Sequence, residues 1–333
     1  MSISVNFVYE MGLLGITAGG VTSALRNLKN ALVERGVEVK ENASRKYDIT
    51  HVHTVGPYAF YKLLTDNVPK VVTAHTIPQE IPHLIKFGER IENFVRRYLR
   101  LFYNLSDVII APTYFAKKKL EEIGVSKRIE VISNGVNAEY FKFSQRMRQS
   151  FRQKYGLRRK TVGCVGLPSD RKGLSTFVEV ARNLPEFDFV WAGKNVFGFL
   201  LKDHKNAKKI LANAPGNFTY LGFVGDIREL YSGIDIFMLP SIIETEGLVI
   251  LEAASAGRPI LVRDVECFSW LAHGENCLKA KSTGEFVSCL KMLDDQELSS
   301  RISKGALKMA KERNIARTCE KVFEIYKSLT QGS

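Results

Sequence analysis

The sequence lacks several features that would assign it to common classes of protein. No apolar run approaches the roughly 20 residues that a membrane-spanning helix needs. The first residues do not have the basic and then apolar layout of a signal peptide. The five cysteines are scattered and form no C-x-x-C pair, which argues against a disulfide framework and against a zinc site. We therefore expect a cytoplasmic protein whose cysteines are buried, reduced thiols.

Several binding motifs are absent as well. The glycines near the amino terminus do not spell G-x-G-x-x-G, which disfavours an oxidoreductase that binds a dinucleotide. A net charge of +13 indicates an anionic partner: nucleic acid, a substrate with phosphate groups or an acidic membrane surface. Without a helix-turn-helix, RNP aromatic residues or a zinc finger, nucleic acid remains only a remote alternative.

What the sequence does contain is a regular alternation of short apolar runs and helical patterns. This alternation is typical of an α/β protein with a parallel, doubly wound sheet. The 333 residues are enough for two domains, each with its own core. The predicted strands are 2–9, 49–53, 70–74, 108–111 and 129–136 in the first part of the chain, and 160–166, 187–192, 220–226, 234–241, 259–262 and 276–279 in the second.

The most informative stretch is 244–257, which follows the predicted strand 234–241. It predicts a helix that starts at Gly247 and ends near Gly257. A helix amino terminus offers free amide groups and partial positive charge, which suit the phosphates of a nucleotide. Glu244 precedes this helix and Glu252 lies inside it, and carboxylates bind sugar hydroxyls well. A capping glutamate and a salt-bridged glutamate would explain the same pattern.

Two other predicted strands end at residues that could bind a ligand. His75 follows the strand 70–74, where open α/β sheets place their ligands, although a solitary histidine is more often structural. Arg171, Lys172 and Gly173 follow the strand 160–166, and adjacent cations at such a turn suit a diphosphate. His51 and His53 alternate within a strand, with no carboxylate or third histidine near them, so we interpret them as packing or rim residues.

The pattern Glu244-x7-Glu252, between a strand and an alanine-rich helix, resembles the signature of retaining family 4 glycosyltransferases, which use nucleotide sugars and have the GT-B fold. In that family the first glutamate contacts hydroxyls of the donor sugar and the second contacts the nucleotide ribose. The resemblance implies these roles for Glu244 and Glu252. It also places the donor diphosphate at the helix that begins with Gly247, Leu248 and Val249.

Further short motifs resemble the family in the expected order. The T-x-H element implies that His75 lies beside the transferred sugar, and the pair Gly19-Gly20 implies a backbone approach to the donor diphosphate. Residues 220–226, including Val224, resemble the segment that frames the nucleobase. Lys172-Gly173 matches the family's K-G element, but Leu167 stands where an arginine is usual. Arg171 is the candidate to compensate for that arginine.

The resemblance implies a division into domains. Residues 1–145 are expected to form a Rossmann-like domain that binds the acceptor. Residues 146–313 would form a second Rossmann-like domain that binds the nucleotide sugar, and 314–333 a helix that crosses back to the first. In GT-B enzymes the two domains face each other across a cleft.

The expected reaction is transfer of a hexose, with retention of anomeric configuration, from a nucleotide sugar that we expect to be UDP-glucose. The resemblance implies that no enzyme nucleophile takes part. We expect no cofactor and no metal, because the cations at 171 and 172 would stabilise the leaving diphosphate and the chain has no Asp-x-Asp pair. Within the family the motifs are similar to those of diacylglycerol glucosyltransferases, which implies a glycerolipid acceptor. A mannosyl- or glucosyltransferase acting on a polysaccharide or soluble acceptor is the alternative.

Two basic segments suit an anionic membrane surface. Residues 86–103 predict an amphipathic helix with an apolar, aromatic stripe beside a basic stripe of Lys86, Arg90, Arg97 and Arg100. The same helix would also serve simply to cover its own sheet. The segment 142–160 has eight basic and no acidic residues, and is either a solvated linker or a second lipid-facing patch. We expect the protein to be peripheral on the inner face of the cell membrane.

Overall fold

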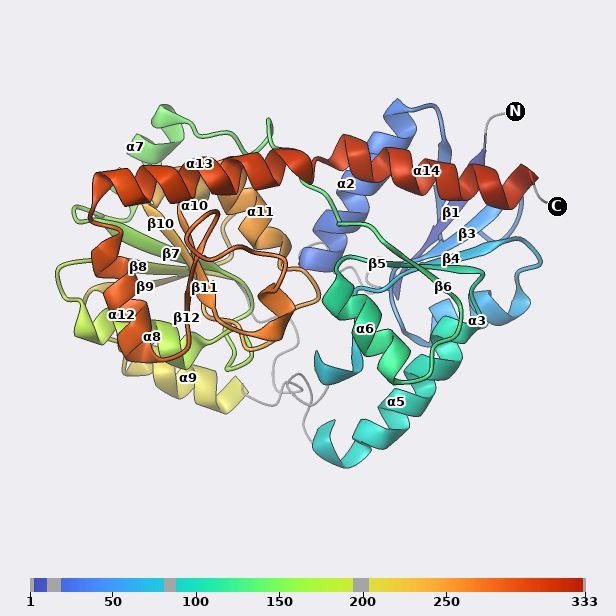
Figure 1. Cartoon of the computed structure of the whole chain (residues 1–333), viewed down its shortest axis with the longest axis horizontal. Coiled ribbons are helices and arrows are strands. Elements are labelled where there is room, and N and C mark those ends of the chain that lie inside the picture. Colours follow the sequence, from blue (N-terminus) through green and yellow to red (C-terminus); the bar gives the residue numbers. More distant parts are fainter. Residues whose placement is uncertain (1–2, 11–18, 81–87, 194–203, 332–333) are drawn as a thin grey trace. The chain divides into compact units, whose positions relative to one another are not determined.

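The computed structural model describes residues 3–10, 19–80, 88–193 and 204–331, with backbone only for 88–90 and 204. Contacts divide the chain into two compact units, labelled by element in Figure 1. Unit 1 comprises Met1–Pro82, Phe87–Gly135 and Arg313–Ser333, and unit 2 comprises His83–Lys86 and Val136–Glu312. Each unit is an α/β layer structure built on its own parallel sheet.

Unit 1 contains a sheet of six described strands in the order β2-β1-β3-β4-β5-β6, all parallel. Helices α2 and α14 lie on one face, and α3, α5 and α6 lie on the other (Figure 1). The strands are β1 (Ser4–Val8), β2 (Glu38–Glu41), β3 (Ile49–Val52), β4 (Lys70–Thr73), β5 (Val108–Ala111) and β6 (Arg128–Val131). The helices are α2 (Gly20–Glu34), α3 (Pro57–Thr65), α5 (Gly88–Asn104), α6 (Tyr114–Glu122) and α14 (Ile315–Gln331), with a 3₁₀ turn at Pro78–Glu80.

The core of unit 1 joins the two ends of the chain. Leu25, Leu28 and Leu32 on α2 pack in one buried cluster with Val322 and Ile325 on α14. These apolar residues recur every three or four positions, so each helix presents one continuous apolar stripe. Burying one such side chain contributes about 1.5–3 kcal/mol. The carboxy-terminal helix is therefore an integral part of the first unit.

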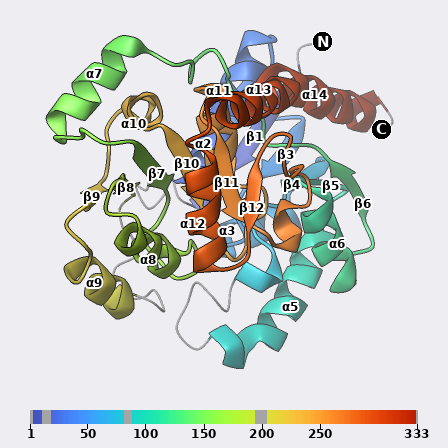
Figure 2. The same cartoon turned by 60° about the vertical axis from the view of Figure 1, so that its left-hand side comes forward.

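Unit 2 contains a second sheet of six described strands, in the order β12-β11-β10-β7-β8-β9, again all parallel. Helices α8, α9 and α12 lie on one face and α10, α11 and α13 on the other (Figure 2). The strands are β7 (Thr161–Val165), β8 (Asp188–Ala192), β9 (Phe218–Gly222), β10 (Ile236–Leu239), β11 (Ile260–Arg263) and β12 (Leu278–Ala280). The helices are α7 (Gln145–Lys154), α8 (Leu174–Asn183), α9 (His204–Ala212), α10 (Ile227–Gly233), α11 (Leu248–Ser255), α12 (Thr283–Met292) and α13 (Gln296–Glu312), with a 3₁₀ turn at Glu266–Phe268.

The predicted α/β class with parallel, doubly wound sheets is confirmed. One strand was not predicted: β2, whose sequence is Glu-Val-Lys-Glu. It is an edge strand with no buried residue, so it lacks the apolar run by which the other strands were found. The strand predicted at 220–226 lies two residues earlier at its start and ends at Gly222, because the chain turns there with a positive φ of 63°.

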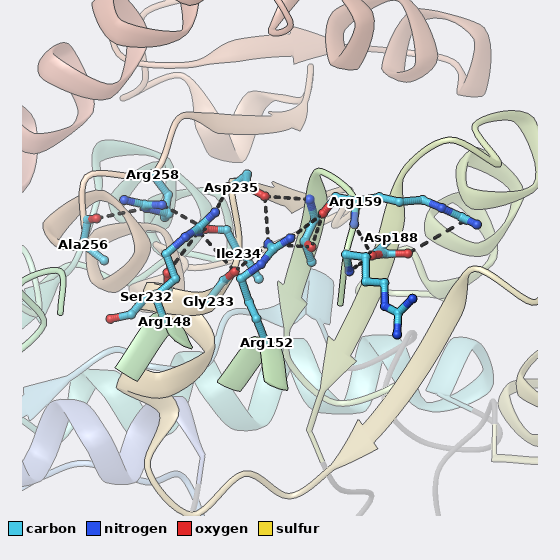
Figure 3. Close-up of polar contacts among 12 residues, drawn as sticks. Arg148, Arg152, Arg159, Asp188, Ser232, Gly233, Ile234, Asp235, Ala256 and Arg258 are labelled. Atoms are coloured by element: carbon cyan, nitrogen blue, oxygen red, sulfur yellow. Dashed lines mark hydrogen bonds and ion pairs between the residues drawn. The ribbon is translucent and has the colours of Figure 1, made fainter. Parts of the chain in front are cut away.

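The basic segment 142–160 is only partly a solvated face. Arg148 and Arg152 both bind the carboxylate of Asp235, at 2.6 and 3.1 Å (Figure 3). They also donate to carbonyl oxygens of Ser232 and Gly233 at the end of α10, where unpaired carbonyls and partial negative charge accumulate. These two arginines therefore attach α7 to α10 at the amino-terminal edge of the sheet. Lys142, Arg146, Lys154, Arg158 and Arg159 are exposed.

The five cysteines are free and buried, as predicted. Among the described helices, none combines the length and the apolar character needed to cross a bilayer.

Candidate active site

The candidate site in unit 2 lies at the point where its sheet changes winding direction. From β7 the chain continues to β8 on one side, and from β10 to β11 on the other, although β7 and β10 are neighbours. In open α/β sheets, ligands bind beyond the carboxyl ends of the two strands that flank such a switch point. The loop 166–173 leaves the end of β7, and the loop 240–247 leaves the end of β10. Of the charged residues predicted for the site, Arg171 and Lys172 lie on the first loop and Glu244 lies on the second.

Contacts between the two loops bring those residues together. The Ile242 amide donates to the Arg171 carbonyl at 2.8 Å, and Arg171 Nη1 donates to the Ile243 carbonyl at 3.0 Å. Lys172 Nζ binds Glu244 Oε1 at 2.6 Å, and Arg171 Nη1 lies 3.7 Å from Glu244 Oε2. One carboxylate is thus held between two cations.

Gly173 shows why the Lys-Gly element needs its glycine. Its φ of 77° lies in the left-handed region, and a Cβ atom here would lie 2.3 Å from the Pro240 carbonyl oxygen. Any side chain would therefore force the two loops apart. The close approach places Lys172 beside the chain that leads to Glu244.

Glu244 is ionised at neutral pH despite its burial. The residue is 5% exposed, and burial alone would raise its pKa. The charges of Lys172 and Arg171 outweigh burial and hold the pKa of Glu244 below its ordinary value. The loop therefore carries a fixed negative charge with matched cations.

Helix α11 starts at Leu248, directly after Gly247, as predicted. Gly247 adopts a φ of 85°, which an L side chain rarely tolerates. The first amides of the helix, from Leu248 and Val249 onward, are those that an α-helix leaves without intrahelical partners. They directly follow the loop that carries Glu244.

Glu252 is the fifth residue of α11 and is 6% exposed. The Tyr231 hydroxyl on α10 donates to its Oε2 at 2.6 Å. Burial raises the pKa of Glu252 to about 7, and the Tyr231 hydrogen bond opposes this rise. Tyr231 was not identified from the sequence, because nothing in its spacing from Glu252 indicates the contact.

Arg263 is a second residue that the sequence did not single out. It lies at the carboxyl end of β11 and donates to the Pro240 carbonyl at 3.0 Å and to Thr176 Oγ1 at 2.7 Å. It therefore connects the loop after β10 to the first turn of α8, which follows Gly173. The one feature of the sequence that could have indicated Arg263 is a positive charge at the carboxyl end of a predicted strand.

The remaining predicted residues of unit 2 take separate positions. Val224 is buried two residues after β9. Leu167 is the second residue after β7, and the cations on its loop, 166–173, are Arg171 and Lys172. Among the described residues, no three histidines, cysteines or carboxylates are placed to hold a metal ion.

Unit 1 holds the other predicted residues. His75 follows β4, and its Nε2 is buried with no hydrogen-bond partner among the described residues. Burial lowers the pKa of His75 to about 4, so the imidazole is neutral at pH 7. Gly19 and Gly20 are exposed at the start of α2, and a Cβ atom at either position would meet no atom within 4 Å. Their backbone is therefore accessible.

The predicted basic stripe is only partly within the described structure. Lys86 lies outside the described residues, and so does the side chain of Arg90. Arg97 and Arg100 are exposed on α5. On the apolar stripe of that helix, Phe102 is fully buried, whereas Phe94 is 70% exposed. The carboxy-terminal half of α5 thus covers its own unit, and the amino-terminal half leaves an aromatic side chain uncovered.

Comparison with known proteins identifies the family of this chain. Residues 40–140 match the family model described as Glycosyltransferase Family 4, and residues 159–295 match the model described as Glycosyl transferases group 1. The processive diacylglycerol alpha-glucosyltransferase of Acholeplasma laidlawii is 30% identical over 316 residues, which cover 93% of this chain and 94% of the relative. The chain belongs to glycosyltransferase family 4. A second relative of this family 4 enzyme, the alpha-galactosylglucosyldiacylglycerol synthase of Streptococcus pneumoniae, is 30% identical over 78% of this chain and 72% of the relative.

Solved structures agree on the fold of this glycosyltransferase. The Anabaena protein Alr3699/HepE, solved in complex with UDP-glucose, has a TM-score of 0.81 at 19% identity and covers 98% of this chain and all of its own. Sucrose-phosphate synthase from Thermosynechococcus elongatus has a TM-score of 0.86 at 15% identity, over 99% of this chain and all of its own. The predicted GT-B class is confirmed.

Proposed function

We propose that this enzyme transfers a glucosyl residue from UDP-glucose to a glycerolipid such as diacylglycerol, with retention of anomeric configuration. The observation that carries the acceptor is the similarity to the Acholeplasma laidlawii diacylglycerol alpha-glucosyltransferase, which extends over 93% of this chain. The Streptococcus pneumoniae relative is also named for a diacylglycerol glycolipid. Glucose as the transferred sugar follows the first of these two names.

The donor would bind at the switch point of unit 2. A nucleoside diphosphate carries negative charge, and Arg171 and Lys172 are the cations on the loop that follows β7. The amide groups of Gly247, Leu248 and Val249 at the start of α11 would bind phosphate oxygens in the same place. As the bond from the sugar to the diphosphate breaks, negative charge grows on the leaving oxygen. Groups already fixed in place stabilise that charge without further rearrangement.

The carboxylates would bind hydroxyl groups. Glu244 is proposed to accept hydrogen bonds from the donor sugar, and its ionised state suits an acceptor of hydrogen bonds. Tyr231 uses only part of the hydrogen-bonding capacity of the Glu252 carboxylate. Glu252 is proposed to accept hydrogen bonds from the ribose hydroxyls with the rest of that capacity. Val224 would lie beside the nucleobase. Gly19 and Gly20, whose backbone is accessible, are proposed to approach the diphosphate, and His75 to contact the transferred sugar.

Because two cations and a helix amino terminus supply positive charge, we propose that transfer requires no metal ion. Chelator should then leave the rate unchanged. The experiment that tests the proposed function measures donor hydrolysis and transfer for UDP- and GDP-sugars, in chelator, with and without diacylglycerol in anionic micelles. We expect UDP-glucose to be consumed rapidly only when diacylglycerol is present.

Each other result of this experiment would contradict one part of the proposal. Equal turnover of a donor with and without lipid would contradict a lipid acceptor and favour a polysaccharide or soluble acceptor. Preference for another donor would contradict UDP-glucose as the donor. The first residue to examine would then be Leu167, which stands where the family usually has an arginine. A requirement for divalent metal would contradict the role given to Arg171 and Lys172.

We propose in addition that α5 binds the anionic surface where a lipid acceptor would lie. Arg97 and Arg100 supply exposed positive charge, and Phe94 supplies an exposed aromatic side chain on the same helix. A helix with both features binds anionic membranes through charge and burial of apolar side chains. Peripheral association with the inner face of the membrane would follow, and Lys86 and Arg90 would extend the basic stripe.

A further inference from the structure

Unit 1 has a switch point of its own, and a histidine lies there that no part of the proposed mechanism uses. In the order β2-β1-β3-β4, strands β1 and β3 are neighbours, and the chain winds away from them in opposite directions. His51 is on β3, and His53 follows directly at its carboxyl end. Ligands bind at such points in open α/β sheets. His75 follows the adjacent strand, β4.

His51 is a structural histidine. Its Nδ1 lies 2.6 Å from the Tyr326 hydroxyl on α14, and its Nε2 lies 2.7 Å from Thr73 Oγ1 on β4. Both ring nitrogens are therefore satisfied by buried protein groups. This is the usual state of a polar side chain inside a protein.

His53, two residues along the same strand face, is in the opposite state. It is 1% exposed, and no described residue forms a hydrogen bond to its Nδ1 or its Nε2. Its ring packs against Phe7 and His51, with ring centroids 4.5 and 4.1 Å apart. A phenylalanine would make these ring contacts without burying two polar atoms. Packing alone does not explain an imidazole here.

His53 and His75 also face each other. Their rings are stacked, with centroids 5.8 Å apart and planes inclined by 25°. The Nε2 of His75 is likewise buried and without a partner among the described residues. The carboxyl ends of β3 and β4 thus hold two imidazoles with three unsatisfied ring nitrogens. A buried polar group without a partner requires an explanation, and a role at a functional site is one.

The chemistry of the pair restricts what it would bind. Burial, together with the neighbouring imidazoles, lowers the pKa of His53 well below its ordinary value, and burial also lowers that of His75. Both rings are therefore neutral at pH 7 and offer no charge to an anion. A neutral imidazole has one nitrogen that donates and one that accepts. A hydroxyl group, which also does both, is the complementary partner.

We propose that His53 and His75 together bind a hydroxyl group on an uncharged part of a substrate. The inference rests on the proposed function, since the hydroxyl would belong either to the transferred sugar or to the acceptor alcohol. It assigns to His53 a binding role in place of the packing role that its strand position indicates. His51 then serves as the matched control, because it lies two residues before His53, on β3, with both nitrogens satisfied.

The test compares His53→Phe with His51→Phe in the full-length enzyme. In His53→Phe we expect an unchanged or higher Tm, because two unsatisfied polar atoms are removed and the aromatic contacts remain. We expect kcat/KM to fall about 10- to 100-fold, the effect of one or two lost hydrogen bonds to substrate. In His51→Phe we expect a lower Tm, because the Thr73 and Tyr326 hydroxyls lose their partner, and kcat/KM within about threefold of wild type.

Calorimetry with UDP and UDP-glucose identifies the source of the hydroxyl. If it belongs to the sugar, His53→Phe weakens binding of UDP-glucose and not of UDP. If it belongs to the acceptor, both affinities are unchanged and the KM for the acceptor rises. Unchanged kinetics and binding in His53→Phe would overturn the proposal. So would a loss of Tm in both His53→Phe and the smaller His53→Leu, which would make His53 structural.

The failure of this proposal is distinguishable from failure of the proposed function. A wild-type enzyme that transfers no glucose to diacylglycerol contradicts the proposed function. Binding of UDP-glucose relative to UDP, and the KM for whichever acceptor the enzyme uses, still decide whether His53 holds a hydroxyl.

Discussion

The two units place different chemistry at equivalent positions of their sheets. At the switch point of unit 2, Lys172 and Glu244 form an ion pair 2.6 Å long, with Arg171 beside them. At the switch point of unit 1, His53 and His75 are neutral, and both ring nitrogens of His53 and the Nε2 of His75 have no hydrogen-bond partner among the described residues. Glu244 and His53 are buried, and Arg171, Lys172 and His75 are partly buried, near the carboxyl ends of parallel strands. Both sheets are thus parallel and doubly wound, but their switch points are opposite in electrostatics.

This difference indicates which part of a nucleotide-sugar substrate the residues of each sheet are able to bind. Charged groups that are already held in place stabilise a diphosphate, whose charge grows during transfer. Neutral imidazoles lack that capacity but can bind hydroxyl groups. One class of sheet therefore supports two kinds of site, because the residues at the strand ends and not the sheets carry the chemistry.

The strongest test of this contrast is to remove the charge from unit 2. In Lys172→Met, transfer should fall about 100- to 1,000-fold, as when one group that stabilises a transition-state charge is lost. The unfolding free energy should fall by about 3 kcal/mol, because Glu244 stays buried without its closest cation. Enzyme kinetics and denaturant unfolding measure the two effects.

Two controls separate catalysis from stability in this test. Lys172→Met combined with Glu244→Leu should recover stability and remain inactive, since the buried carboxylate is gone as well. Lys160→Met breaks a lysine–aspartate pair 2.8 Å long at the amino end of the same strand, β7. It should leave transfer unchanged. A wild-type rate in Lys172→Met would contradict the donor site.

A second test asks which unit binds lipid. Exchanging Arg97 and Arg100 on α5 for glutamine should weaken binding to anionic vesicles by about 2 kcal/mol, or roughly 30-fold, at about 1 kcal/mol for each basic residue. The matched control exchanges Arg146 and Arg158, which are exposed on unit 2. Vesicle sedimentation measures both. Equal losses in the two variants would show that general charge, and not α5, drives binding.

The smallest expected effect concerns the carboxylate that Tyr231 holds. Ionised Glu252 accepts hydrogen bonds from ribose hydroxyls, so UDP affinity should rise as pH rises through about 7, where Glu252 loses its proton. Tyr231→Phe removes a hydrogen bond that lowers the pKa of Glu252, so this rise should move to higher pH. At pH 7 we expect binding weaker by about 1 kcal/mol, measured by calorimetry on both sides of pH 7.

The same group makes a prediction for stability. Because the pKa of Glu252 rises from 4.5 to about 7 on folding, the folded state binds more protons than the unfolded state between these values. The unfolding free energy should therefore fall as pH rises from 4.5 to 7. In Glu252→Gln that part of the pH dependence should vanish. If it persists, another group is responsible.

Much of the fold was predictable because apolar runs report burial directly. Strand β5 was predicted with the bounds that it has, and the strand at β10 was found from its apolar residues. Strand β2 was not predicted, since its exposed edge position requires no apolar run. The charged residues at 171, 172 and 244 were predicted because each follows a strand, and strands in parallel sheets end at the same edge.

The sequence by itself determined the alternation of strands and helices, the family, and the residues that stand at strand ends. These depend on local composition and spacing, which can be read along one dimension. Only the tertiary structure decided that Lys172 meets Glu244, that Tyr231 meets Glu252, and that His51 is satisfied while His53 is not. Hydrogen bonds and ion pairs form between groups far apart in the chain. Their partners are chosen by strand order and loop contact, which spacing in the sequence does not record.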